Sequence, residues 1–489
     1  MQLLAVIALA LIAFTAFAGP AIQPGDLALR HDIQRLADYG VITGTVTTWP
    51  LEWGPILQDI RQFQTGDALP ADVTDALARV RVRGDWETRT DEARFRARAA
   101  AQEKPARIRS FQNTPREEGE LSAGLSWTGE RLSIDLNATG VSDASDGEDL
   151  RADGSHIAFA FGNMTIAASS LDRWWGPAWD NSLILSSNAR PFPAITIDRR
   201  FTSPFKTRWL SWLGSWDASF VWGQLEKERA VPNAQFLGFR FNFRPIPSLE
   251  IGISRTAQWC GDGRPCDTST FWDLLIGQDN VGSDDITLEN EPGNQTAALD
   301  FRWSVASLGL PVAFYGQFMA EDEAGGFPSR YMGQIGADGT GYLGGKWSYR
   351  WYAEASATSC DFWKSDEIFN CAYNHGIYQS GYRYYGRVIG HGVDNDARVA
   401  TLGLMLVDAD ENSWQGYIRG GKLNRGGPPD AANSLTPMPQ DVLNVELVHN
   451  RVFSFGRLEF GVGYDRFDGN PTLPSSNETR AFIQWRSDY

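Results

Sequence analysis

The sequence predicts an all-β transmembrane barrel of about 18 antiparallel strands, preceded by a small N-terminal α-helical bundle. Three observations support this fold class. The spacing of apolar residues changes from a helical period to strict alternation near residue 118 and then alternates to the end of the chain. Glycines number 49 and aromatic residues make up 12%, a composition typical of strands and turns. The mean hydropathy is only −0.32, as expected where lipid-facing and lumen-facing residues alternate.

Residues 1–18 are predicted to be a signal peptide. Residues 3–17 form the one long apolar run, and Ala16-Phe17-Ala18 matches a small-x-small cleavage site. A buried N-terminal helix is the alternative. The rest of the chain contains no run of 18 apolar residues, so the sequence predicts no membrane-spanning helix there.

Residues 19–110 are predicted to form a helical bundle on the periplasmic side. Asp26 can cap the first helix, which Gly40 ends, and three apolar stripes recur at helical spacing. The stripes comprise Leu29, Ile33 and Leu36, residues 53–63, and residues 73–80. A charged stretch, residues 94–109, then leads out of the bundle toward the barrel, which is predicted over residues 111–489.

The barrel prediction depends on how many alternating segments there are and how similar they are. In the clearest segment one face is wholly apolar and the other is polar and cationic. The apolar face carries Leu237, Phe239, Phe241 and Phe243, and the polar face carries Gly238, Arg240, Asn242 and Arg244. About 370 residues follow the bundle, which at roughly 20 residues for each strand and turn gives about 18 strands. Short connections alternate with long acidic ones, and a secreted sandwich or propeller is the alternative architecture.

The four cysteines predict an oxidising compartment and two local disulfides. Cys260 and Cys266 enclose a five-residue Gly/Pro segment, and Cys360 and Cys371 enclose a polar loop. Reduced thiols are the alternative, and a zinc site is disfavoured because neither pair has C-x2-4-C spacing.

The net charge of −16 excludes a general nucleic-acid binder, because phosphate neutralisation needs an excess of Lys and Arg. The five histidines are scattered, with no H-E-x-x-H motif, and no G-x-S-x-G motif occurs. The sequence therefore predicts no catalytic residues, no metal and no cofactor.

One cationic, Trp-rich stretch interrupts the alternation at residues 171–216. Between Asp172 and Arg208 it has six basic residues against three acidic ones. Indole faces stack on sugar rings and guanidinium groups bind carboxylates and hydroxyls, so the stretch is predicted to bind an anionic polysaccharide. Composition alone favours the alternative, a packed loop inside the barrel. The candidate binding residues are Arg173, Trp174, Trp175, Trp179, Arg190, Arg199 and Arg200.

Over essentially its whole length the chain resembles the Wzi family of capsule-assembly proteins of the Gram-negative outer membrane, and four motifs in a specific order and spacing carry the resemblance. They are Leu29-Arg-His-Asp-Ile-Gln-Arg-Leu-Ala-Asp-Tyr-Gly-Val-Ile42, Trp49-Pro-Leu51, Arg173-Trp-Trp-Gly-Pro177 and Ser186-Ser-Asn-Ala-Arg-Pro-Phe-Pro193. The resemblance implies a barrel whose periplasmic mouth is covered by the helical bundle. It also implies a lectin-like role at the cell surface, with no catalytic machinery to carry over.

The predicted function is therefore non-enzymatic: an outer-membrane protein that attaches or organises a capsular, acidic polysaccharide. Its expected partners are that polysaccharide and outer-membrane lipid, and we expect a monomer. A porin or substrate-selective channel is the main alternative. A glycan-modifying enzyme is a weaker one, since Asp172, Asp180 and Asp198 could supply a carboxylate pair.

Overall fold

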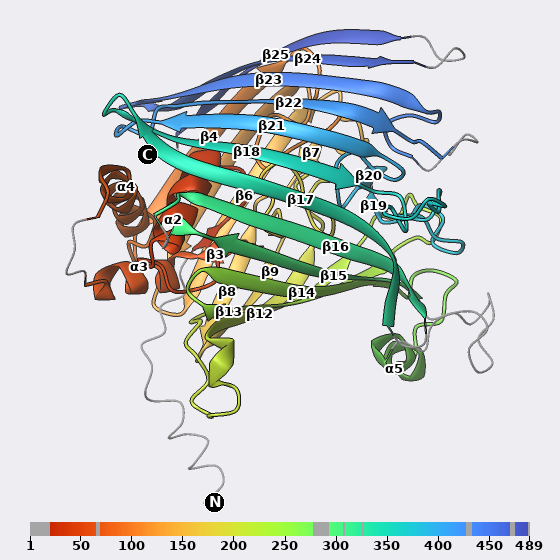
Figure 1. Ribbon diagram of the computed structural model, residues 1–489, viewed down its shortest axis with the longest axis horizontal. Coiled ribbons are helices and arrows are strands. Elements are labelled where there is room, and N and C mark those ends of the chain that lie inside the picture. Colours follow the sequence, from red (N-terminus) through yellow and green to blue (C-terminus); the bar gives the residue numbers. More distant parts are fainter. Residues whose placement is uncertain are drawn as a thin grey trace, which may run out of the picture.

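The computed structural model shows a closed antiparallel β-barrel with three helices, α2–α4, at one end (Figure 1). We call that end the helix end and the opposite end the loop end. The predicted signal peptide lies outside the described residues. These are residues 20–64, 69–276, 293–306, 309–324, 327–426, 433–469 and 475–487.

The barrel wall consists of strands that pair in chain order, and β25 closes it against β4. β7 (Leu150–Arg151) is a short piece beside β6, which also pairs directly with β8. The described wall therefore has 18 full strands, which confirms the predicted fold class. They are β4 (Ala93–Gln102), β5 (Gly119–Thr128), β6 (Leu132–Ser142), β8 (His156–Phe161), β9 (Met164–Ser169), β11 (Ala194–Arg199), β12 (Ser215–Gln224), β13 (Gln235–Ile246), β14 (Leu249–Trp259), β15 (Gly293–Ser304), β16 (Val312–Ala324), β17 (Phe327–Leu343), β18 (Trp347–Ala357), β21 (Arg398–Val407), β22 (Ser413–Leu423), β23 (Gln440–Phe453), β24 (Gly456–Asp468) and β25 (Ser476–Arg486).

Alternation along each strand sorts residues between the lumen and the outer surface. In β13, Arg240 and Asn242 are fully buried on the lumenal side, whereas Phe239 is half exposed on the outer side. The same exposed apolar surface recurs around the wall, for example at Leu402 and Val462. The polar face therefore points into the barrel, the reverse of a soluble sandwich.

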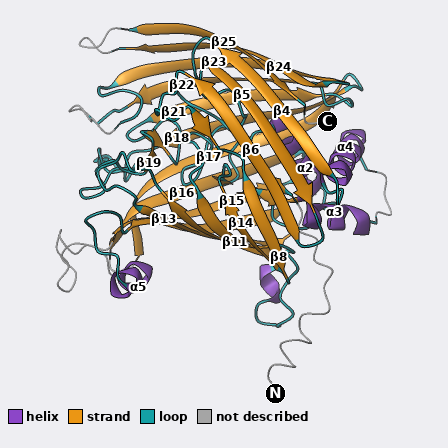
Figure 2. Ribbon diagram, turned by 180° about the vertical axis from the view of Figure 1, so that it is seen from behind, coloured by secondary structure: helices purple, strands orange, loops and turns teal. Residues whose placement is uncertain are grey.

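The predicted boundary between bundle and barrel differs from the structure. β4 begins at Ala93, within the stretch predicted to lead out of the bundle, and it pairs with both β5 and β25. Figure 2 shows β4, β5 and β6 together on one side of the wall. The barrel therefore begins before residue 111.

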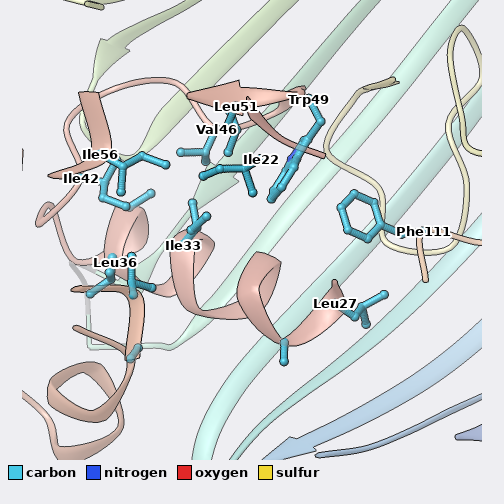
Figure 3. Packing of buried hydrophobic residues seen from close by; sticks show 14 of the residues in the cluster. Ile22, Leu27, Ile33, Leu36, Ile42, Val46, Trp49, Leu51, Ile56 and Phe111 are labelled. Carbon is cyan, nitrogen blue, oxygen red and sulfur yellow. The ribbon is translucent and has the colours of Figure 1, made fainter. Parts of the chain in front are cut away.

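The three predicted helices are α2 (Leu27–Asp38), α3 (Trp53–Gln62) and α4 (Ala71–Glu87). The carboxylate of Asp26 caps α2 by accepting a hydrogen bond from the Leu29 amide at 3.0 Å. α2 packs in an apolar cluster that includes Ile33, Trp49 and Phe111 (Figure 3). Within the described chain, no helix has the length and apolar character needed to cross a membrane.

Short strands fold the N-terminal segment on itself and join it to the barrel interior. β1 (Ala21–Ile22) pairs with β3 (Leu51–Glu52), and β2 (Thr48–Trp49) pairs with β10 (Trp174–Trp175). The remaining described elements are β19 (Arg383–Tyr384), β20 (Arg387–Val388), the 3-10 turn Ser211–Leu213 and α5 (Thr268–Ile276). Disulfides join Cys260 to Cys266 and Cys360 to Cys371, the two local pairs that the sequence favours.

Candidate functional site

Two segments fold inward from the loop end and occupy much of the lumen. We call residues 170–193 the plug and residues 358–397 the inner loop. They share a buried cluster in which Leu183 and Ile184 meet Tyr373 and Tyr382. The Tyr373 hydroxyl donates to the Leu183 carbonyl at 2.7 Å, and the Tyr382 hydroxyl donates to the Ile184 carbonyl at 2.9 Å. The two segments thus form one packed unit inside the wall.

The three candidate tryptophans of the plug are fully buried. Trp174 and Trp175 form β10, which pairs with β2 of the N-terminal segment. The ring of Trp179 lies beneath two guanidinium groups, with Arg30 and Arg350 at 4.4 Å and 4.3 Å from its centroid. Their indole faces contact protein groups, so in this conformation none is free to stack on a sugar.

The candidate arginines fall into two groups. Inside the barrel, Arg173 donates to the Leu171 carbonyl at 3.1 Å, and Arg190 binds both Asp153 and Asp146. Toward the helix end, Arg200 pairs with Glu52 at 3.1 Å, and Arg199 donates to the carbonyl oxygens of Trp216 and Ser203. The structure therefore does not bring the seven predicted residues together at one exposed surface.

Buried polar contacts attach the plug to the barrel wall. Asp180 accepts from both the Nε and Nη2 atoms of Arg419 on β22. Glu354 on β18 accepts from the Trp179 amide at 2.5 Å, and Gln317 on β16 accepts from the Leu183 amide at 2.6 Å. Burial would raise the pKa of Asp180, but the charge of Arg419 holds it below its ordinary value.

The three carboxylates that a glycan-modifying enzyme could use, Asp172, Asp180 and Asp198, all accept hydrogen bonds from protein donors. Arg419 binds Asp180, and the Ser219 hydroxyl donates to Asp198 at 2.5 Å. Burial raises the pKa of Asp172 above its ordinary value of 3.8, although Arg116, which donates to it at 2.9 Å, opposes that rise. Among the described residues, no group of three or more His, Cys, Asp or Glu side chains is arranged to hold a metal ion.

The buried imidazole of His391 predicts that the protein loses stability in mild acid. Its Nδ1 atom accepts from the Val393 amide at 3.3 Å, so the buried ring is neutral, and burial lowers its pKa from 6.5 to about 3. The unfolded chain therefore takes up this proton first as the pH falls. Below pH 6.5 the free energy of unfolding should fall by about 1.4 kcal/mol for each pH unit through this group.

Chemical unfolding at pH 7.5 and pH 5 measures this effect. The His391→Gln variant should lose less stability between the two pH values than the unmodified protein does. The half-buried His375 of the same inner loop offers the matched control, His375→Gln. Identical pH profiles for the unmodified protein and His391→Gln would contradict the assignment.

The loop end carries an exposed aromatic residue that is not among the seven predicted from the sequence. Trp363 is 54% exposed and lies in the part of the inner loop that is closed by the Cys360–Cys371 disulfide. The rings of Tyr331 on β17 and of Phe362 lie at 5.7 Å and 5.0 Å from its ring. The ammonium group of Lys364, beside it in sequence, is half exposed and pairs with Asp361. This arrangement presents an indole and a cation to solvent on a cross-linked support.

A polar cavity of about 270 Å³ lies between the N-terminal segment and the lumenal faces of β4, β5 and β6. Its wall carries ion pairs, including Arg98 with Glu120 and Arg96 with Asp135. Because these charges already have partners, the cavity offers no free cation for an anionic sugar.

Comparisons with known proteins agree with this geometry. The family model of the capsule assembly protein Wzi matches residues 89–472. The chain is 34% identical over 345 residues to an uncharacterised 55.8 kDa protein in the cps region of Klebsiella pneumoniae. That alignment covers 70% of this chain and 66% of the relative, just under two thirds of its length.

A solved structure is similar over nearly the whole chain. It is Wzi of Escherichia coli, described as an outer-membrane protein involved in group 1 capsule assembly and as a carbohydrate-binding β-barrel. The TM-score is 0.84 and the sequence identity is 28%, with 96% of this chain and 100% of that chain covered.

Proposed function

The chain belongs to the Wzi family of capsule assembly proteins, and from this premise we propose that it binds capsular polysaccharide at the outer membrane without catalysing a reaction. The observation that carries this proposal is the combination of a filled lumen with an exposed, cross-linked aromatic site at the loop end. We infer that the helix end faces the periplasm, because its connections are mostly short and those of the loop end are long, as in outer-membrane barrels, so that the loop end faces the outside of the cell. A polymer held there needs a surface to lie on and no open passage.

We place the primary sugar contact at Trp363. A sugar ring needs a solvent-exposed indole face, which Trp363 has and the plug tryptophans lack. The disulfide restricts the loop before binding, so less conformational entropy is lost when the sugar binds. The seven residues predicted from the sequence then act indirectly, because they hold the plug that supports the inner loop.

We propose that the bound polysaccharide is acidic, since the side chain of Lys364, next to Trp363 in sequence, is 49% exposed and so stays accessible to a polymer although it pairs with Asp361. Binding should then weaken as salt is added, because exposed charge pairs are screened. A neutral polymer would bind equally at low and high salt.

The Trp363→Ala variant is expected to bind the polysaccharide more weakly, since one stacked ring contributes about 1 kcal/mol, or roughly a fivefold change in affinity. Binding of purified protein to the host's own surface polysaccharide measures this, with neutral dextran as the non-ligand. Trp414→Ala is the matched control, because Trp414 is 40% exposed but lies at the helix end, stacked on His449 at 4.1 Å. Equal binding by both variants would exclude Trp363 as a contact.

A porin is the second candidate that the sequence leaves open. It requires a continuous aqueous path, whereas the plug, the inner loop and α2 occupy the lumen. We therefore propose that the unmodified protein does not conduct ions in a planar bilayer.

A further inference from the structure

The connection between β11 and β12 at the helix end is cationic, unlike the chain as a whole. We call residues 200–214 the interfacial loop. From Arg199 to Trp216 the sequence has four basic residues and no acidic one. Trp209 and Trp212 are 73% and 60% exposed. Both ribbon views show the interfacial loop projecting away from the barrel wall, while α2–α4 lie at the barrel mouth (Figures 1 and 2).

The base of the interfacial loop packs firmly against the barrel. Phe205 stacks on Trp216 with ring centroids 4.4 Å apart and planes 9° apart. The guanidinium group of Arg199 lies 3.7 Å from the centroid of the same Trp216 ring and donates to the Ser203 carbonyl at 3.0 Å. These contacts attach the base of the loop to β11 and β12.

The interfacial loop continues the outer surface of the wall. Trp212 meets Phe243 of β13 edge-to-face at 6.0 Å, and Trp216 lies 5.6 Å from Phe241 of the same strand. Phe241 and Phe243 belong to the apolar, outward-facing side of β13. The interfacial loop therefore joins the lipid-facing wall at its periplasmic edge. This edge lies at the level of the lipid headgroups in the periplasmic leaflet of the outer membrane.

We propose that the interfacial loop binds anionic phospholipid headgroups of the periplasmic leaflet. Lys206 and Arg208 are exposed, and among the described residues neither forms an ion pair with a carboxylate of this chain. Their charge complements a lipid phosphate, and Trp209 and Trp212 are of the residue type enriched at the boundary between headgroups and acyl chains. The proposal rests on the outer-membrane location and not on which polysaccharide is bound.

Native mass spectrometry of the full-length protein in detergent tests this proposal, with phosphatidylglycerol and phosphatidylcholine as the added lipids. The Lys206→Gln/Arg208→Gln double variant should retain at least about fivefold less phosphatidylglycerol than the unmodified protein, with phosphatidylcholine retention unchanged. Lys104→Gln/Lys422→Gln is the matched control, because it removes two exposed cations at the loop end. The control should retain phosphatidylglycerol normally.

Three results would overturn the proposal: equal phosphatidylglycerol retention by the two double variants, an equal loss of both lipids, or weaker polysaccharide binding with lipid retention unchanged. The last result would identify the interfacial loop as a polymer contact. Heat-dependent gel mobility establishes that each variant is folded. Lipid retention by the Lys206→Gln/Arg208→Gln protein tests the lipid proposal, and polysaccharide binding by the same protein tests the proposed function. The two measurements are independent, so one proposal can fail while the other stands.

Discussion

Replacing Asp338 with alanine is expected to lower the free energy of unfolding by about 3 to 5 kcal/mol, because it breaks a buried charge network by removing its shared anion. Asp338 lies on β17, is 1% exposed, and accepts hydrogen bonds from Arg302 and Arg350. It also accepts from the Trp179 indole at 3.3 Å. Arg302 keeps its second partner, Asp38 of α2, whereas Arg350 keeps no carboxylate partner among the described residues.

Guanidinium-induced unfolding in detergent, followed by tryptophan fluorescence, measures the loss. Asp85→Ala is the matched control, since Asp85 pairs with Arg61 at the surface and is about half exposed. Exposed pairs contribute at most about 1 kcal/mol, so this variant should unfold almost as the unmodified protein does. Equal losses in the two variants would show that the network does not stabilise the barrel.

A double substitution separates the effect of charge from that of packing. Replacing a buried ion pair by apolar groups of similar volume is often neutral. Asp338→Leu/Arg350→Met should therefore recover much of the stability that Asp338→Ala loses. If the double variant is no more stable than the single one, the loss comes from the cavity and the altered packing.

The barrel could be predicted from sequence because its alternation is strong where lipid-facing residues are large, as in β13. The sequence pattern does not indicate β4, because the outward-facing residues of this strand are mostly small. Phe95 is exposed on that face, but Ala97 and Ala99 follow it, and the inward Arg96 and Arg98 dominate the pattern. A strand with alanines toward lipid and arginines toward the lumen therefore looks like a charged linker.

The plug could be located but not interpreted from sequence. Composition alone favours a packed interior over a sugar site for its Trp and Arg residues, and the contacts that establish this packing come from far along the chain. Arg30 of α2 lies over Trp179 and donates to the carbonyl oxygens of Pro177 and Ala178 at 3.2 Å and 2.7 Å. The sequence of residues 171–216 alone therefore does not predict the contact with Arg30.

The sequence around Trp363 gives no sign that this residue is exposed. It is the one tryptophan of a mostly polar loop, and its exposure becomes visible only in the folded structure, where the rings of Tyr331 and Phe362 lie near its own. The enclosing cysteines were a usable signal, because a disulfide around a lone tryptophan indicates a loop that is held in place.

Excising both the plug and the inner loop is expected to convert a silent barrel into an ion-conducting channel. The register makes both excisions feasible: Ser169 on β9 is the direct partner of Ala194 on β11, and Ala357 on β18 is the partner of Arg398 on β21. A two-residue Asn-Gly turn can therefore join each pair of strands. Once water fills the lumen, wall residues such as Arg419 are solvated, so this change should cost less stability than leaving a charge buried and unpaired.

Planar-bilayer recording of the unmodified and excised proteins measures the result. The matched control replaces residues 260–292 by the same turn between Trp259 and Gly293, which are also direct partners. This excision likewise removes one complete disulfide, but the described helix α5 packs on the outer side of the wall, where Leu274 meets Trp259 and Leu237. The control should stay silent while the double excision gives steady openings.

Conduction by the unmodified protein would instead support the porin alternative. Silence of the doubly excised barrel would show that α2 and the rest of the N-terminal segment close the helix end without help from the plug.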